Sequence, residues 1–402
     1  MTENDILLKS VLSGTFFNAW KNDLQDMANI NFKGIEIYLT PKCNLRCRYC
    51  YLQRHMEDLY PDHLTDPETI LKNLSMLLDW LMENGYKPHV DIFSGELFSQ
   101  KLGFDALELI YEKYKGRNGI KQICIPTNFT FICSDKLTEK VEMLIWKFAA
   151  IGIKLYLSCS MDGKHCEDNR PANGKLIRDD AYYDRVFEFC RKYGYGFHPM
   201  IYAEHIENWI DNFNWFIEMF DRHGYPNYPL YLLEVRNEEW TESQMVKFGE
   251  FIRYLVKWCR DRGRDIHKGG FNILSSMMSK IGRGIGCSLQ SMLYVRMGDL
   301  MIVPCHRTSY EGLEYGQFVT DGQKITDIRA HNVENCITTL SFEADTFPMC
   351  ETCLIKEQCS HGCLGCQYET TGDMFIPNPN VCLLEHYKVE YFNKEYKNGT
   401  DS

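Results

Sequence analysis

Cys43-Asn44-Leu45-Arg46-Cys47-Arg48-Tyr49-Cys50 places three cysteines within eight residues, in a C-x3-C-x2-C spacing. The preceding segment, residues 34–40, alternates apolar and polar side chains, a pattern typical of a β-strand. We therefore expect the cysteines in a loop at the C-terminal end of that strand. Enzymes with parallel sheets place their reactive groups at this end.

Three thiolates on so short a loop can bind one inorganic centre. A structural zinc site needs a fourth nearby ligand to complete its tetrahedron, and His55 is the nearest candidate. An iron–sulfur cluster held by three cysteines instead leaves one iron free for another ligand. The spacing favours the cluster, and a zinc knuckle is the alternative.

The cysteine loop resembles the signature of the radical S-adenosylmethionine (SAM) superfamily. Tyr49 occupies the aromatic position before the last cysteine of that signature. The resemblance implies a [4Fe–4S] cluster on Cys43, Cys47 and Cys50 whose free iron binds the amino and carboxylate groups of SAM. It also implies that Tyr49 packs near the adenine.

Composition limits the classes of partner. The net charge of −11 argues against a general nucleic-acid binder, which usually has a basic excess. No apolar run approaches the ~20 residues of a membrane helix, and residues 1–5 do not begin a signal peptide. We therefore expect a cytoplasmic protein without a membrane partner. Eighteen cysteines in such a chain indicate metal or redox chemistry.

Residues 34–265 alternate strand and helix patterns in six units, which predicts a parallel sheet with helices outside. We predict an α/β fold, a partial (β/α)6 TIM-like barrel, as the resemblance also implies. Residues 1–33 form an N-terminal cap segment in this division. Residues 266–402 form a small, loop-rich, cysteine-rich domain.

Three strand ends carry candidate SAM contacts by resemblance to the superfamily. Ser94, Gly95 and Glu96 stand where the family has Gly-Gly-Glu-Pro, whose polar groups receive the SAM amino group. The small residues allow close backbone approach, and a carboxylate suits an ammonium group. The remaining candidates are Asn128 for the ribose, and Ser160 with Arg170 for the ribose and the SAM carboxylate. Ordinary strand-end turns are the alternative.

The last third of the chain holds a second array of cysteines, C-x2-C-x5-C-x3-C followed by a lone cysteine. Two zinc ribbons are one explanation. The array also resembles the SPASM extension of radical SAM enzymes, which carries two auxiliary [4Fe–4S] clusters. The resemblance assigns one cluster to Cys350, Cys353, Cys359 and Cys382, and the other to Cys287, Cys305 and Cys363. The fourth ligand of the latter is either absent, leaving an open iron, or is Cys336 or Cys366.

SPASM enzymes mostly modify ribosomally made peptides or proteins. The resemblance thus implies a maturase that uses a 5′-deoxyadenosyl radical to form an intramolecular crosslink, a thioether or a carbon–carbon bond. It implies a peptide substrate with a leader, and an electron donor such as flavodoxin or ferredoxin.

Two alternatives remain. An anaerobic sulfatase maturase would oxidise cysteine or serine to formylglycine, but His306 and Arg307 follow Cys305 where that family tends to have an acidic base. A non-enzymatic zinc scaffold is the alternative of another class.

Overall fold

The computed structural model describes residues 34–117, 119–266, 271–278, 292–332, 338–339 and 347–400, with the backbone alone for 397–400. The predicted cap at 1–33, Cys287 and Cys336 lie outside the described residues. Contacts divide the chain into two units, which we describe separately. Unit 1 holds the described residues of Met1–Asn44, Tyr51–Ser158 and Ser288–Ser341, and unit 2 holds those of Leu45–Cys50, Cys159–Cys287 and Phe342–Ser402.

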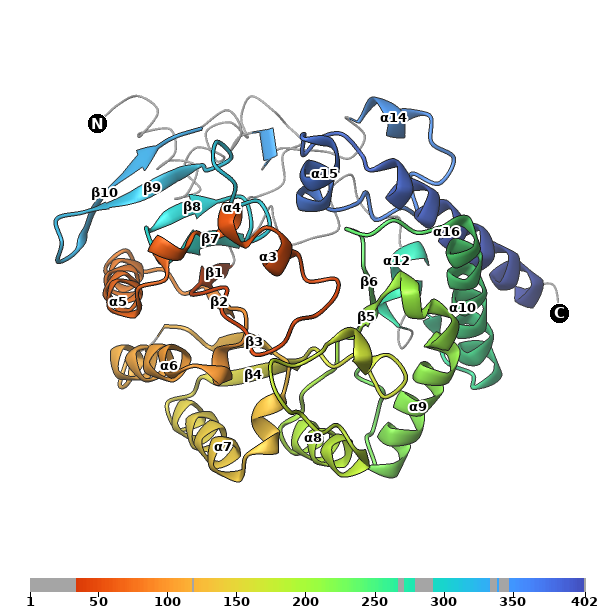
Figure 1. Cartoon of the computed structure of the whole chain (residues 1–402), viewed down its shortest axis with the longest axis horizontal. Coiled ribbons are helices and arrows are strands. Elements are labelled where there is room, and N and C mark those ends of the chain that lie inside the picture. The colour runs from red at the N-terminus through yellow and green to blue at the C-terminus, as the bar shows by residue number, and fades with distance from the viewer. Residues whose placement is uncertain are drawn as a thin grey trace. The chain divides into compact units, whose positions relative to one another are not determined.

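An eight-stranded sheet forms the centre of unit 1, in the order β10-β9-β8-β7-β1-β2-β3-β4 (Figure 1). The strands are β1 (Gly34–Tyr38), β2 (His89–Phe93), β3 (Gln122–Thr127), β4 (Lys154–Cys159), β7 (Met292–Arg296), β8 (Met301–Val303), β9 (Gly316–Thr320) and β10 (Ile325–Ala330). β1 pairs in parallel with both β2 and β7, whereas β7–β10 pair in antiparallel fashion. The four strands β7–β10 were not predicted.

Buried apolar stripes account for the longer helices of unit 1. α5 (Pro67–Glu83) begins after Asp66, whose side chain accepts a hydrogen bond from the Thr69 amide, and it buries its apolar stripe. The others are α3 (Tyr51–Arg54), α4 (Met56–Leu59), α6 (Lys101–Tyr114) and α7 (Asp135–Ala150), with 3-10 turns η1 (Asp62–Leu64), η2 (Leu97–Ser99) and η3 (Thr130–Cys133). The predicted alternation of strand and helix is therefore confirmed in this unit, in the chain order β1, α5, β2, α6, β3, α7.

Unit 2 contains the remaining strand–helix units and the C-terminal helices. Its two-stranded sheet pairs β5 (Met200–Ile201) with β6 (Leu233–Glu234). The helices are α8 (Asp180–Tyr193), α9 (Trp209–Arg222), α10 (Glu242–Asp261), α12 (Asn272–Met278), α14 (Pro348–Glu351), α15 (Leu364–Thr371) and α16 (Pro379–Thr400), with 3-10 turns η4 (Glu167–Asn169) and η5 (Ala203–Asn208).

α10 and α16 lie side by side in unit 2 (Figure 1). Gly249 of α10 makes this approach possible, because a Cβ atom there would lie 2.5 Å from the Tyr391 ring of α16. Unit 2 therefore contains β6 together with Cys382, Glu385 and Lys388 of α16. None of the helices in the described residues is long and apolar enough to cross a membrane.

Candidate active site

The cysteine loop falls in both units: Cys43 belongs to unit 1, and Cys47 and Cys50 to unit 2. Segment 45–50 is held by backbone hydrogen bonds, from Arg46 N to Pro171 O at 2.7 Å and from Arg48 N to Asn169 O at 2.8 Å. All three thiols are partly exposed, and none forms a disulfide. Burial raises the pKa of the Cys47 thiol to about 11, and the neighbouring Arg170 charge opposes this rise.

Tyr49 has a fixed orientation in unit 2. Its hydroxyl donates to Asp162 Oδ2 at 2.6 Å, and its backbone carbonyl accepts from Asn237 Nδ2 at 3.2 Å. Asp162 is fully buried and its Oδ1 accepts from the Met200 amide at 2.9 Å. Burial raises the pKa of the Asp162 carboxyl to about 7, against the opposing effect of Arg170.

Ser160 and Arg170, the predicted SAM contacts of unit 2, lie together. Arg170 Nη2 donates to Ser160 Oγ at 3.2 Å, and Arg170 Nη1 lies 3.6 Å from Glu167 Oε1. The Arg170 side chain is buried, yet its Nε and Nη1 atoms have no hydrogen-bond partner. Since a buried donor without a partner costs free energy, this guanidinium is suited to a carboxylate ligand.

In unit 1, Gly95 lets two strand ends approach each other closely. A Cβ atom at Gly95 would lie 2.2 Å from Pro41 O and 2.3 Å from Lys42 O. The contact is closed by hydrogen bonds from Gly95 N to Thr40 O at 2.8 Å and from Glu96 N to Lys42 O at 3.0 Å. The predicted Ser94-Gly95-Glu96 segment therefore lies against the residues that lead into Cys43.

Glu96 joins the ends of β2 and β3. Its buried carboxylate accepts from Thr127 Oγ1 at 2.8 Å and from the Asn128 amide at 2.7 Å. Asn128 in turn donates through Nδ2 to Asn44 Oδ1 at 2.8 Å. The structure thus links the predicted contacts Glu96 and Asn128 to each other, and links Asn128 to the residue next to Cys43. Their roles toward SAM remain predictions.

A histidine–carboxylate pair in unit 1 was not predicted. His306 Nδ1 lies 2.6 Å from Glu36 Oε1, and its ring stacks on Phe93 with 4.1 Å between centroids. Asp91, on the neighbouring strand, has its carboxyl pKa raised by burial, and the Glu36 charge adds to this rise. In the sequence, Glu36 was only a polar position in an alternating strand. The position of His306 directly after Cys305 was the one available signal.

Five cysteines line a single pocket of unit 2, together with His361, Gln367 and Glu385. The cysteines are Cys350, Cys359, Cys363, Cys366 and Cys382. Burial raises the pKa of the Cys382 thiol to about 11, with further contributions from Cys350 and Cys353. Burial likewise raises the pKa of the Cys359 thiol to about 12. Three of the four residues predicted for one auxiliary cluster, Cys350, Cys359 and Cys382, therefore line this pocket, and the fourth, Cys353, affects the Cys382 thiol.

The ligands predicted for the other auxiliary cluster are not brought together within one unit. Cys363 lines the pocket just described, Cys305 belongs to unit 1, and Cys287 lies outside the described residues. Of the two candidates for its fourth ligand, Cys336 is also outside them, whereas Cys366 is buried and lines the pocket beside Cys363.

No group of three or more cysteine, histidine or acidic side chains among the described residues is arranged to hold a single metal ion. The cysteines of an iron–sulfur cluster bind different irons, so they need not converge on one point.

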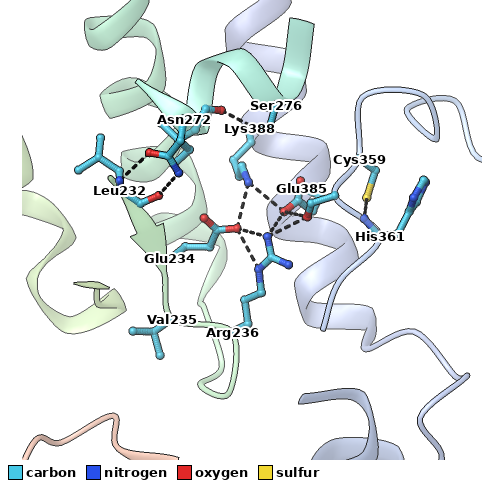
Figure 2. Close-up of polar contacts among 12 residues, drawn as sticks. Leu232, Glu234, Val235, Arg236, Asn272, Ser276, Cys359, His361, Glu385 and Lys388 are labelled. Carbon is cyan, nitrogen blue, oxygen red and sulfur yellow. Dashed lines mark hydrogen bonds and ion pairs between the residues drawn. The ribbon is translucent and has the colours of Figure 1, made fainter. Parts of the chain in front are cut away.

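Four charged side chains, of which Glu234, Glu385 and Lys388 are buried, form ion pairs near Cys359 (Figure 2). Glu234 at the end of β6 pairs with Arg236 and with Lys388 of α16, the latter at 3.1 Å. Glu385 of α16 pairs with Lys388 at 2.9 Å and with Arg236 at 3.3 Å. We call these four residues the charge network. These ion pairs give Glu234 and Arg236 a structural role at the end of β6.

Comparison with solved structures gives clear fold matches. Native anSMEcpe with bound AdoMet has a TM-score of 0.60 at 16% identity, covering 91% of this chain and 99% of that chain. Native anSMEcpe with bound AdoMet and Kp18Cys peptide has a TM-score of 0.59 at 16% identity, covering 91% and 100%. Streptococcus suis SuiB bound to precursor peptide SuiA has a TM-score of 0.52 at 13% identity, covering 91% and 80%.

The chain has the fold of radical SAM enzymes with a SPASM extension. This confirms the predicted fold class, a partial barrel with a cysteine-rich C-terminal part. No protein-family model matches the chain, and no curated protein matches it significantly.

The residues of this chain fit the cofactors that such a fold implies. In unit 2, the unpartnered donors of buried Arg170 suit a carboxylate, and the pocket gathers five thiols. In unit 1, Gly95 lets the backbone pack tightly against the segment before Cys43. Each of these features lies within one unit.

Proposed function

We propose that this protein is a radical SAM maturase that modifies a ribosomally made peptide or protein. The observation that carries the proposal is the gathering of Cys350, Cys359 and Cys382 in one pocket, in a chain that also has the C-x3-C-x2-C loop and the radical SAM fold. Peptide substrates are supported by SuiB, solved with its precursor peptide, and by anSMEcpe, solved with a peptide.

Cys43, Cys47 and Cys50 would hold a [4Fe–4S] cluster with SAM. When bound, this cofactor pair supplies a 5′-deoxyadenosyl radical that takes a hydrogen atom from an unactivated carbon. The protein's part is to bind and orient. Arg170, which donates to Ser160 Oγ, would offer its Nε and Nη1 donors to the SAM carboxylate.

We assign the other predicted residues to the remaining polar groups and the adenine of SAM. The Ser94-Gly95-Glu96 segment offers oxygen acceptors to the SAM amino group, with the Glu96 carboxylate already fixed by Thr127. Asn128 would meet the ribose, and Tyr49, oriented by Asp162, would pack near the adenine.

We further propose two auxiliary [4Fe–4S] clusters. Cys350, Cys353, Cys359 and Cys382 would hold one, and Cys287, Cys305 and Cys363 would contribute to the other. An open iron on the latter would suit a thioether-forming enzyme, because a substrate cysteine could bind there as a thiolate. In that case the product is an intramolecular thioether. The alternative product within the same reaction class is a carbon–carbon crosslink.

A second candidate function is conversion of cysteine or serine to formylglycine, and His306 favours it. The sequence offered no acidic base after Cys305. The structure places Glu36 2.6 Å from His306 Nδ1, an arrangement in which the carboxylate orients the imidazole and its Nε2 can accept a proton. The same pair would serve a crosslinking reaction, which also releases a proton from the substrate.

The test is incubation of the anaerobic, iron-loaded protein with SAM, a reductant and candidate cysteine-containing precursor peptides. A crosslink appears in the mass spectrum as the loss of two hydrogen atoms. If the crosslink is a thioether, the product also has no free thiol. Formylglycine made from cysteine appears as the loss of two hydrogen atoms together with replacement of the thiol sulfur by oxygen. Failure of the iron-loaded protein to cleave SAM under all these conditions would overturn the proposal.

A further inference from the structure

The charge network joins the end of β6 to α16 in unit 2 (Figure 2). Glu234 and Arg236 come from the end of β6, and Glu385 and Lys388 come from α16 one and two turns after Cys382. Ser360, the residue after Cys359, forms hydrogen bonds with two members of the network. Its Oγ lies 2.8 Å from Arg236 Nη2 and 3.2 Å from Glu385 Oε1.

The network also reaches the pocket directly. Glu385 is one of the residues that line it, beside Cys359 and Cys382. The charges of Glu385, Lys388 and Arg236 all act on the Cys359 thiol. The thiols and the network therefore share one electrostatic environment, in which the effective dielectric constant is lower than in water.

Stability alone is a weak reason for this arrangement. The side chains of Glu234, Glu385 and Lys388 are at most 5% exposed, and that of Arg236 is 18% exposed. Removing such charges from water costs several kcal/mol per ion, and apolar residues of similar size often stabilise a fold equally well. Fixed charges do, however, set the position of neighbouring groups and the potential that they experience.

We propose that Arg236, Glu385 and Lys388 are positioning residues that set the reduction potential of an iron–sulfur cluster in this pocket. The inference rests on the proposed function, which supplies the cluster. A thiolate-bound cluster gains one negative charge on reduction, and net charge and hydrogen bonds near the cluster set its potential. In the complete network the two cations balance the two carboxylates, so removal of either sign shifts the potential in a definite direction.

The experiment uses the full-length chain with Cys43, Cys47 and Cys50 replaced by alanine, so that only auxiliary clusters give a signal. Iron content and the midpoint potential from an anaerobic redox titration monitored by electron paramagnetic resonance are measured. The signal that disappears in Cys359→Ala is assigned to this pocket. We expect Arg236→Gln to shift its midpoint to a more negative potential and Glu385→Gln to shift it to a more positive one.

Two further variants separate charge from folding. Arg236→Lys keeps the charge and should keep the midpoint close to that of the parent chain. Lys394→Met removes a lysine from the same helix α16 at an exposed pair with Glu390, and it should leave the midpoint unchanged.

These measurements distinguish a failure of the inference from a failure of the proposed function. If the parent chain binds iron but Arg236→Gln and Glu385→Gln move the midpoint in the same direction, or leave it unmoved, the inference is overturned while the proposed function stands. The inference is also overturned if both variants lose the iron altogether, because the network is then needed for assembly. If the unmodified protein binds no iron in this pocket, both the proposed function and the inference fail.

Discussion

Arg170 is a buried cation of unit 2 whose Nε and Nη1 atoms have no hydrogen-bond partner, so we expect it to bind a carboxylate. We expect Arg170→Met to weaken SAM binding about ten- to a hundred-fold, because a hydrogen bond to a charged group is worth about 1.5–3 kcal/mol. Titration calorimetry of SAM into the anaerobic, iron-loaded protein measures this. Arg222→Met, at an exposed ion pair of the same unit, is the matched control. Unchanged affinity in Arg170→Met would remove Arg170 from the SAM site.

His306 is expected to act in the reaction and not in SAM binding. Both His306→Ala and Glu36→Gln should lower the yield of modified peptide about a hundred-fold or more, the range typical of a positioned general base. Cleavage of SAM should persist, so the ratio of peptide product to 5′-deoxyadenosine falls. His223→Ala removes a histidine with a similar carboxylate contact, to Asp184 at 3.0 Å, and should leave this ratio unchanged. A normal ratio in both test variants would exclude the pair from proton transfer.

Asp162 predicts a pH dependence of folding. Its carboxyl ionises near pH 4 in the unfolded chain and near pH 7 in the folded one, since burial disfavours the charge. Between these values the folded protein binds the extra proton. The free energy of unfolding should therefore be greatest below about pH 4 from this group and decline until about pH 7.

The Asp162→Asn variant isolates that decline. Asparagine cannot ionise, so the variant should lack this part of the slope, although it loses one of the two accepted hydrogen bonds. Chemical unfolding at several pH values between 5 and 8 measures both slopes. Identical slopes would mean that Asp162 is ionised throughout.

At this scale the sequence identified residues by type and spacing, not by environment. The cysteine loop could be recognised from the sequence, because three thiols in that spacing have few functions in proteins. Glu36 could not be recognised, because a buried carboxylate and an exposed one look alike in an alternating strand. Only the fold shows that His306 reaches Glu36 from a position 270 residues later in the chain.

Whole elements were predicted best where caps and apolar spacing agreed. α7 and α8 are examples, because Ser134 and Asp179 accept amide hydrogen bonds at their starts and buried residues recur at helical spacing. β5 and β6 are shorter than their apolar patterns. β7–β10 were missed because a region dominated by glycine and cysteine signals gave no clear strand–turn pattern.

The loop joining β2 to η2 offers an element-scale prediction. Gly95→Ala should reduce the free energy of unfolding by about 1–3 kcal/mol, the usual cost of overpacking, because the new methyl group meets two backbone carbonyls that cannot rotate away. Denaturant unfolding of the apoprotein measures it. Ser94→Ala, which loses only a hydroxyl contact to Thr40 O, is the control and should cost less. Equal stability of the two variants would contradict the close approach.

For the whole molecule, the decisive quantity is its iron content. We expect about twelve irons and matching acid-labile sulfide per chain for three four-iron clusters, falling to about eight when Cys43, Cys47 and Cys50 are replaced by alanine. Four irons together with zinc would keep the SAM cluster and remove the auxiliary ones. Zinc alone would point to the non-enzymatic scaffold. Anaerobic purification followed by metal and sulfide analysis measures this.

The order of the strands in unit 1 was beyond sequence reasoning. β7 follows roughly 260 residues after β1, yet it pairs with β1 from Gly34↔Met292 to Tyr38↔Arg296. Periodicity reports which residues form a strand but not which strand lies beside it. The predicted boundary at residue 265 therefore divides the chain along its sequence, while the sheet joins residues on both sides of it.

That pairing has a consequence for synthesis of the protein on the ribosome. β1 emerges early and pairs with β2, but its other edge has no parallel partner until the residues of β7 have been translated. An open strand edge is a template for association with other chains, and long-range pairing is slow. Nascent chains should therefore depend on chaperones through this interval, and a truncated product ending at residue 265 would keep the edge permanently and aggregate.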